Sequence, residues 1–340
     1  MFVSMELLGG GIVISAIAKL LKSVYPRARI YVVGEQHRSG KLESFFKEHS
    51  WVDELIICPV RGDSTFGEWV RFYRKLRTYN LDVCILSPNH SCANSVFLYL
   101  CGMPEIVGVY LPKTWPWHEK IENKFLDRRL TTEEMGDGYR LLTFPEAYGR
   151  MFTGRKDFKL AEMVPFIRFS DTLQTGEGPR VTFHAGGPAH RRWPVERFAE
   201  LGRMLIQRYG ATVYIIGGEE EQDLARQIKK SIDRVVPDGK VLNCCGCSLN
   251  ETMNYVAHSQ LYVGNNAGTL QIAVALGTPV VGVFQERDRW FSGPDAIGTE
   301  HCVVSRASAD AVPVKEVWNA IEDRWADRLC ASQAGRDVVA

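Results

Sequence analysis

The sequence predicts an α/β protein built from two Rossmann-like, doubly wound domains that face each other across a cleft. The chain has 340 residues, which fits two domains of ordinary size. Apolar strand-like segments alternate with segments of helical period in both halves, which is typical of parallel sheets with right-handed crossovers. A polar stretch without periodicity separates the two series. We therefore expect an N-terminal domain over 1–167, a linker over 168–179 and a C-terminal domain over 180–330.

The N-terminal half begins with an apolar segment at residues 2–8, which predicts a strand, and Gly9-Gly10-Gly11 then predicts a turn. Residues 12–25 place apolar side chains at the 3.6-residue period of a helix, and Pro26 is expected to end it. Further strands are predicted at 29–33, 55–58 and 82–86, a helix at 67–77, and helices within the charged, tryptophan-rich segment 111–150.

The C-terminal half shows a more regular alternation. Strands are predicted at 180–184, 212–216 and 240–243, and helices at 194–209, 219–232, 249–257 and 314–326. The run 261–284 contains a buried strand, a glycine-containing loop, a short helix of small residues and a second buried strand. Backbone N–H groups at the start of such a helix are free to bind phosphate, so the run predicts an anion site. The alternative is an ordinary α/β unit that binds nothing.

Composition limits the class of protein. Apolar residues make up 45% of the chain and charged residues 24%, as in globular proteins of aqueous compartments. The net charge of +1 provides no electrostatic reason to expect nucleic acid or an anionic membrane as a partner. No apolar run reaches the roughly 20 residues of a transmembrane helix. The amino terminus also lacks the basic leader of a signal peptide, so a cytoplasmic location is expected.

Nine cysteines, an odd number, are consistent with free thiols in a reducing compartment. Cys244, Cys245 and Cys247 are close enough in sequence to raise the question of a metal site. Zinc sites usually present spaced pairs of ligands, and no fourth ligand follows nearby. We expect these residues to be buried thiols, and no metal-binding residues are predicted.

Four motifs in the C-terminal half occur in an order and spacing that resemble glycosyltransferase family 9, which contains the ADP-heptose heptosyltransferases. They are His184–Pro194 (HAGGPAHRRWP), Gly217–Glu221 (GGEEE), Cys247–Glu251 (CSLNE) and Val263–Ala273 (VGNNAGTLQIA). The N-terminal half matches more loosely, through Leu8-Gly9 and residues 21–26. The resemblance implies the GT-B fold, an ADP-sugar donor bound by the C-terminal domain, an acceptor bound by the N-terminal domain, and no separate cofactor.

The resemblance also assigns roles around the donor phosphates. Arg191 stands where the family has its basic residue before Trp-Pro and is expected to neutralise the diphosphate, with Arg192 as the second candidate. The alternative is a solvated arginine pair at a helix start. Because positive charge is unfavourable there, we favour an anion nearby. Gly186 and Gly187 would let backbone N–H groups approach the phosphate closely.

Other donor contacts are implied in the same way. Glu221 matches the acidic residue that holds the nucleotide ribose, although a glutamate here could instead complement the dipole of its own helix. Ser248, Leu249 and Met253 fall at the base pocket, where an apolar leucine and methionine are equally consistent with core. The loop and helix start of the opening run supply the remaining positions, Asn266, Ala267, Gly268, Thr269 and Gln271.

Two departures from the family pattern affect the acid–base chemistry. The family's catalytic aspartate after the first strand is Gly10 here, and its Asp-Ser/Thr-Gly-x-x-His motif is replaced by residues 266–271 (NAGTLQ). Inverting transfer to a hydroxyl normally requires a base that removes the proton. The candidates retained are Glu6, which precedes the glycine turn, His118, in a segment similar to an acceptor-side helix, and His184, which ends a strand; His90 and Glu105 are further alternatives.

Two functions are consistent with this pattern. The first is an inverting, metal-independent glycosyltransferase that moves a sugar such as heptose from an ADP-sugar to a small-molecule, glycan or polypeptide acceptor. The second is a catalytically silent sugar-nucleotide-binding scaffold or partner subunit. Release of ADP in the presence of acceptors distinguishes them.

Overall fold

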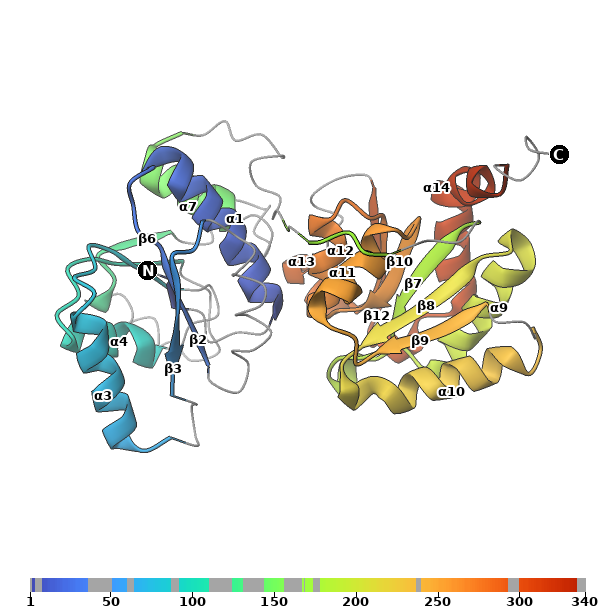
Figure 1. Ribbon diagram of the computed structural model, residues 1–340, viewed down its shortest axis with the longest axis horizontal. Helices are drawn as coiled ribbons and strands as arrows, with labels where there is room; N and C mark the ends of the chain where they lie inside the picture. The colour runs from blue at the N-terminus through green and yellow to red at the C-terminus, as the bar shows by residue number, and fades with distance from the viewer. Residues whose placement is uncertain are drawn as a thin grey trace. The chain divides into compact units, whose positions relative to one another are not determined.

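The computed structural model divides the chain into two compact units, residues 1–166 and 167–340, which we call the N-terminal and C-terminal units (Figure 1). The residues that the structure describes are 2–3, 8–35, 51–59, 64–86, 92–109, 124–130, 144–155, 167, 169–173, 178–236, 240–292 and 300–334. Each unit is a parallel β-sheet with helices packed on its faces, so the α/β prediction is confirmed.

The N-terminal unit contains a six-stranded sheet in the order β3-β2-β1-β4-β5-β6, with every neighbouring pair parallel. Its strands are β1 (Phe2–Val3), β2 (Tyr31–Glu35), β3 (Glu54–Cys58), β4 (Cys84–Leu86), β5 (Ile106–Val109) and β6 (Arg128–Leu130). Its described helices are α1 (Leu8–Val24), α3 (Phe66–Arg77), α4 (Cys92–Leu100) and α7 (Phe144–Thr153). Helices α1 and α7 pack against each other, and α3 lies beside α4 (Figure 1).

Two sequence expectations for this unit are wrong. Gly9-Gly10-Gly11 does not form a turn, because α1 begins at Leu8 and includes all three glycines. The buried apolar face that follows, with Ile12 and Ile17 almost fully enclosed, offsets the cost of about 1 kcal/mol for each glycine in a helix. The segment 111–150 also contains a strand, β6. A strand of three residues is too short for an alternation of apolar and polar side chains to be recognised in the sequence.

The C-terminal unit contains a second parallel six-stranded sheet, in the order β12-β11-β10-β7-β8-β9. Its strands are β7 (Arg180–His184), β8 (Thr212–Gly217), β9 (Val241–Cys245), β10 (Leu261–Asn265), β11 (Val280–Gln285) and β12 (His301–Arg306). Its α-helices are α9 (Val195–Tyr209), α10 (Gln222–Asp233), α11 (Leu249–Ala257), α12 (Gly268–Ala275), α13 (Glu286–Ser292) and α14 (Val314–Ala334). Short 3₁₀ turns are η3 (Ala189–Arg191), η4 (Glu219–Glu221) and η6 (Ala309–Ala311).

Strand order determines where this unit can bind a ligand. Strand β7 lies at the centre, with β8 on one side and β10 on the other, so the chain changes direction across the sheet at β7. Ligands of doubly wound sheets bind at the carboxyl ends of the strands beside such a switch point. Here those ends are His184 of β7 and Asn265 of β10. Beneath them lies a continuous core that includes Phe183, Trp193 and Phe198.

Among the described helices of both units, none has the length and apolarity needed to cross a bilayer.

Candidate functional site

The candidate site lies at the carboxyl ends of β7 and β10 in the C-terminal unit. The two strands run parallel, and His184 is paired in register with Gly264. After His184 the chain forms a loop through Gly186 and Gly187, and after Asn265 it continues to the start of α12 at Gly268. The two loops therefore emerge side by side at one edge of the sheet.

Glu221 is the charged residue to which the loops at this edge are hydrogen-bonded. It is buried, and its Oε1 accepts the N–H of Gly187 at 2.8 Å while its Oε2 accepts the N–H of Gly218 at 2.9 Å. His184 Nε2 lies 3.3 Å from the same Oε2. Burial acts to raise the pKa of the Glu221 carboxyl, but the hydrogen bond and charge of His184 and the two N–H groups outweigh burial and lower the pKa to about 2. Glu221 is therefore ionised at neutral pH. Its carboxylate contacts the end of β7, the loop that follows β7 and the start of η4.

The glycines of the loop are required by stereochemistry. A Cβ at Gly186 would lie 1.5 Å from Glu221 Oε1, closer than any two non-bonded heavy atoms can approach. Gly187 has φ +98°, in the left-handed region that residues with side chains disfavour. Both positions predicted for close phosphate approach thus form a compact backbone turn against the Glu221 carboxylate.

Asn265 fixes the loop from the opposite side, and the sequence analysis missed it. Its side chain is fully buried; Oδ1 accepts the Trp193 N–H at 2.9 Å and Nδ2 donates to the Gly186 carbonyl at 3.0 Å. Trp193 in turn donates its indole N–H to the Val312 carbonyl at 2.8 Å. One available signal was the position of Asn265, a polar residue that ends an otherwise apolar strand directly before a glycine-containing loop.

The two candidate arginines differ in their surroundings. Arg192 Nε donates to the Gly187 carbonyl at 2.6 Å, so this side chain supports the loop. Arg191 Nε lies 2.9 Å from Oδ2 of Asp288 in α13, in an ion pair not aligned as a hydrogen bond, and 36% of the Arg191 side chain is exposed. Asp288 is held by Gln285, whose Nε2 donates to the same oxygen at 2.7 Å. Arg191 is thus a positioned cation that solvent, or a ligand, can reach.

The start of α12 has unsatisfied polar groups. Ala267 occupies the N-cap position, and no side chain caps the helix. Gln271, in the first turn, is only 3% exposed, and its Oε1 has no hydrogen-bond partner among the described residues. Thr269 Oγ1 lies 2.8 Å from the Tyr262 hydroxyl, so the threonine already has a partner in the core. Asn266 and Gly268, like Ala267, are partly exposed on the loop and helix start.

The residues predicted for a base pocket have visible structural roles. Ser248 caps α11, with its hydroxyl accepting from the Glu251 N–H at 3.2 Å, Leu249 is half-buried and Met253 is buried. Burial raises the pKa of Cys244 to about 11 and that of Cys245 to about 12. Within the described ranges, no group of three or more histidine, cysteine or acidic side chains is arranged to hold a metal ion.

Of the five candidate bases, His184 and Glu105 are among the described residues. Glu6, His118 and the alternative His90 lie outside the described residues. Glu105 precedes β5, at the edge where the strands begin, and forms an ion pair with Arg128. His184 is buried beside Glu221 and only 3% exposed.

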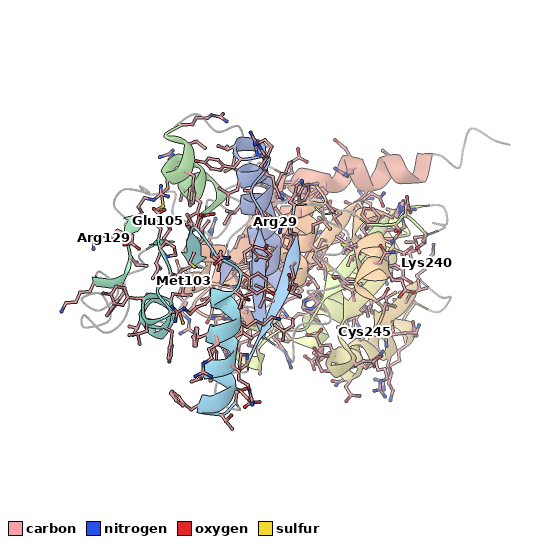
Figure 2. All side chains as sticks on the ribbon, turned by 60° about the vertical axis from the view of Figure 1, so that its left-hand side comes forward. Arg29, Met103, Glu105, Arg129, Lys240 and Cys245 are labelled. Carbon is pink, nitrogen blue, oxygen red and sulfur yellow. The ribbon has the colours of Figure 1, made fainter. Side chains whose placement is uncertain are left out.

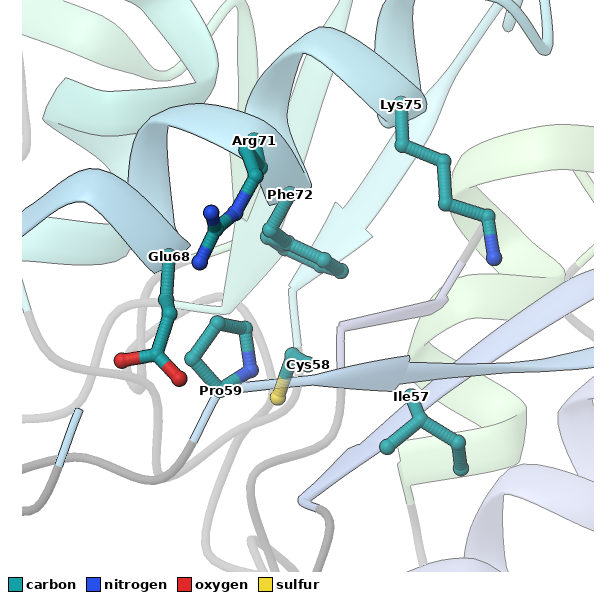
Figure 3. A pocket seen from close by; sticks show the side chains of 7 residues that line it. All are labelled: Ile57, Cys58, Pro59, Glu68, Arg71, Phe72 and Lys75. Atoms are coloured by element: carbon teal, nitrogen blue, oxygen red, sulfur yellow. The ribbon is translucent and has the colours of Figure 1, made fainter. Parts of the chain in front are cut away.

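The N-terminal unit has a small pocket where β3 ends beside α3 (Figure 3). It encloses about 250 Å³, and its lining consists of Ile57, Cys58, Pro59, Glu68, Arg71, Phe72 and Lys75. Glu68 accepts the backbone N–H of Thr65 at 2.7 Å and so caps its own helix. Arg71 and Lys75, one turn apart on α3, are both exposed and make the pocket a candidate subsite for an anion.

Comparison with known proteins agrees with this geometry. Residues 157–316 match the model of glycosyltransferase family 9 (heptosyltransferase). Lipopolysaccharide heptosyltransferase 2 of Salmonella typhimurium is 24% identical over 295 residues, covering 81% of this chain and 79% of that protein. Lipooligosaccharide heptosyltransferase 2 of Haemophilus influenzae is 27% identical over 126 residues, 36% of each chain. A heptosyltransferase of Escherichia coli solved with ADP superposes with a TM-score of 0.70 at 16% identity, covering 95% of this chain and 98% of that one, which confirms the expected GT-B fold.

Proposed function

On the match of residues 157–316 to glycosyltransferase family 9, we propose that this chain is a member of that family. It would transfer heptose from ADP-heptose, bound at the carboxyl edge of the C-terminal unit, to an acceptor bound by the N-terminal unit. The observation that carries the proposal is the combination of the Gly186–Gly187 loop, the partly exposed Arg191 and the uncapped start of α12. The heptose follows from the names of the relatives, and the ADP from the ligand of the Escherichia coli structure.

The chemistry of sugar transfer explains why these groups belong together. As the bond between the anomeric carbon and the phosphate oxygen breaks, negative charge builds on the departing diphosphate. A guanidinium and the positive end of a helix stabilise this charge without a metal ion. We assign the guanidinium to Arg191, and the helix end to α12, whose first N–H groups are capped by no side chain among the described residues.

His184 and Glu221 have a positioning role in this proposal. Both oxygens of Glu221 already accept N–H groups of the loops, so its carboxylate fixes the backbone that surrounds the phosphates. A ribose hydroxyl could share one of these oxygens, because a carboxylate has room for more than two donors. An inverting mechanism requires the base to come from the acceptor side, where Glu6 and His118 are the candidates.

The lining of the pocket in the N-terminal unit suggests which chemical group the acceptor bears. The pocket between β3 and α3 presents Arg71 and Lys75 (Figure 3), so we propose that the acceptor bears a phosphate or carboxylate near its reacting hydroxyl. Gly10 is a specific observation in favour of the second function, silent binding, because this position in α1 has no side chain that could act as a base.

Calorimetric titration of ADP tests the donor site. We expect Arg191→Gln to weaken ADP binding by roughly 10- to 100-fold, the value of one charge-assisted hydrogen bond. Arg226→Gln, an exposed arginine on α10, is the matched control and should leave the affinity unchanged. Equal affinities for wild type and Arg191→Gln would show that the diphosphate binds elsewhere.

Release of ADP from ADP-heptose then separates the two functions. The transferase releases ADP faster when a phosphorylated or carboxylated acceptor is added, and Arg71→Gln should raise the acceptor KM with little change in kcat. A protein that binds ADP-heptose tightly but never releases ADP, across sugar, metabolite and peptide acceptors, is the silent binder.

A further inference from the structure

The N-terminal unit has a second, larger pocket, at the edge of its sheet where the strands begin. Its volume is about 870 Å³, within the range of roughly 300–1,000 Å³ that is typical of small-molecule sites. The lining includes Tyr31, the first residue of β2, residues 81–83, which precede β4, and Arg128, the first residue of β6. Ligands of doubly wound sheets bind at the opposite, carboxyl edge, so the proposed sugar transfer does not account for this pocket.

The segment between α1 and β2, residues 25–30, forms one wall of the pocket and is held by side chains on both sides. Lys22, in the last turn of α1, complements the negative end of that helix. Its Nζ donates to the Ala28 carbonyl at 2.7 Å and lies 2.8 Å from Oδ2 of Asp53. The same oxygen of Asp53 accepts the Ile30 N–H at 2.7 Å. Because these bonds define the path of the backbone, the segment presents its side chains from a fixed support.

Arg27 and Arg29 are the two cations of this segment, and both are exposed. Arg29 is labelled in Figure 2, as is Glu105. Neither arginine side chain forms a hydrogen bond or an ion pair with the residues that the structure describes. Among the described lining residues, Asp82 is the only acidic one, and Arg128 is paired with Glu105. The lining therefore has an excess of positive charge, which favours an anionic ligand.

Four aromatic side chains are also among the lining residues: Tyr25, Tyr31, Tyr79 and Phe152. The Tyr31 and Tyr79 rings meet edge to face, with centroids 4.9 Å apart. Tyr79 is oriented by its hydroxyl, which donates to Glu54 Oε1 at 2.6 Å. The Tyr25 hydroxyl donates to the Phe152 carbonyl at 3.1 Å, yet 46% of Tyr25 is exposed, so its ring can contact a ligand.

We propose that this pocket binds a planar aromatic anion, with Arg27 and Arg29 on the anionic group and the tyrosine rings against the planar ring. Guanidinium groups bind phosphate and carboxylate through paired hydrogen bonds, and planar rings stack on tyrosine. A nucleoside monophosphate and an aromatic carboxylate share this chemistry. The inference goes beyond the proposed function, because binding at this edge requires no sugar transfer.

Calorimetric titration of the full chain tests the proposal, with uridine monophosphate and para-hydroxybenzoate as probes. We expect saturable, equimolar binding of at least one probe, and binding about tenfold weaker for the uncharged analogues uridine and phenol. The probe that binds more tightly identifies the ligand as nucleotide or aromatic carboxylate.

Two sets of variants test the contacts. Arg27→Gln with Arg29→Gln should weaken probe binding by about tenfold or more. Tyr25→Leu should weaken it by about two- to tenfold, the value of one aromatic contact, whereas Tyr25→Phe keeps the ring and should retain the affinity.

Matched controls lie on the C-terminal unit. Lys230→Gln with Arg234→Gln removes the same charge from exposed positions at the end of α10 and should leave probe affinity unchanged. Arg191→Gln reports whether a probe binds at the donor site instead. Thermal unfolding followed by circular dichroism establishes that each variant is folded. The proposal is overturned if neither probe binds, if the uncharged analogues bind as tightly as the anions, or if Arg191→Gln weakens binding while Arg27→Gln with Arg29→Gln does not.

Discussion

Substituting Glu221 by glutamine should reveal how much the buried carboxylate contributes to stability. The gap between the usual pKa of 4.5 and about 2 corresponds to about 3 kcal/mol of stabilisation above pH 4.5. Glutamine has nearly the same shape but offers one accepting oxygen, so either the Gly187 or the Gly218 N–H is left opposite an NH₂ group. We therefore expect Glu221→Gln to lower the free energy of unfolding at pH 7 by about 3 kcal/mol.

The pH dependence gives a second, independent readout. Because the native pKa of Glu221 is lowered, its contribution is present in full above pH 4.5 and is lost as pH falls toward 2. Linkage predicts that the wild type loses about 1 kcal/mol of this contribution by pH 4 and about 2 kcal/mol by pH 3. Glu221→Gln cannot titrate at this position, so the difference between the two proteins should shrink by these amounts.

Urea unfolding followed by tryptophan fluorescence at pH 7, 4 and 3 measures both quantities. Other carboxylates with lowered pKa values, such as Asp53 and Glu251, are present in both proteins and cancel in the difference. The reasoning is refuted if Glu221→Gln is within about 0.5 kcal/mol of wild type at pH 7, a value typical of neutral surface substitutions. A difference that stays constant from pH 7 to pH 3 would equally show that Glu221 is not the titrating group.

Two further substitutions test the loop beside Glu221. Gly186→Ala places a methyl group 1.5 Å from Glu221 Oε1, so it should lower the free energy of unfolding by at least about 2 kcal/mol and weaken ADP binding. The control is Gly67→Ala in α3, where no atom lies nearer than 4.0 Å; it should be neutral or stabilising by up to about 1 kcal/mol. Similar melting temperatures for the two alanine variants would contradict this. Asn265→Ala leaves the Trp193 N–H and the Gly186 carbonyl unpaired in the interior, so thermal unfolding should show a loss of about 2–4 kcal/mol; a loss below about 1 kcal/mol would mean that water replaces the amide.

Much of the C-terminal unit could be predicted from sequence because its signals are local. Strand β7 and helix α11 have the bounds that the pattern predicted, 180–184 and 249–257. Gly210 ends α9 with φ 62°, a conformation in which glycine is favoured. In the N-terminal unit the local signals were weaker: three glycines resembled a turn, and the three residues of β6 provided no periodicity.

The net charge of the chain is distributed unevenly. The total is +1, whereas α3 alone has a net charge of +3. Averaging over the chain hides a basic helix, and the sequence pattern did not indicate that the helix beside it would leave Phe97 and Leu100 exposed. Both facts depend on which faces the sheet covers.

The sequence by itself determined the alternation of strands and helices, the glycines of the loop after β7 and, through the family resemblance, the choice of Arg191 and Glu221 as candidate site residues. Only the tertiary structure decided the partners of these residues. Gly187 donates to Glu221 across 34 residues of chain, and Asn265 reaches Gly186 across 79. Such pairs form because β7 lies between β8 and β10. Strand order results from packing the whole unit around one core, so no local pattern of residues specifies it.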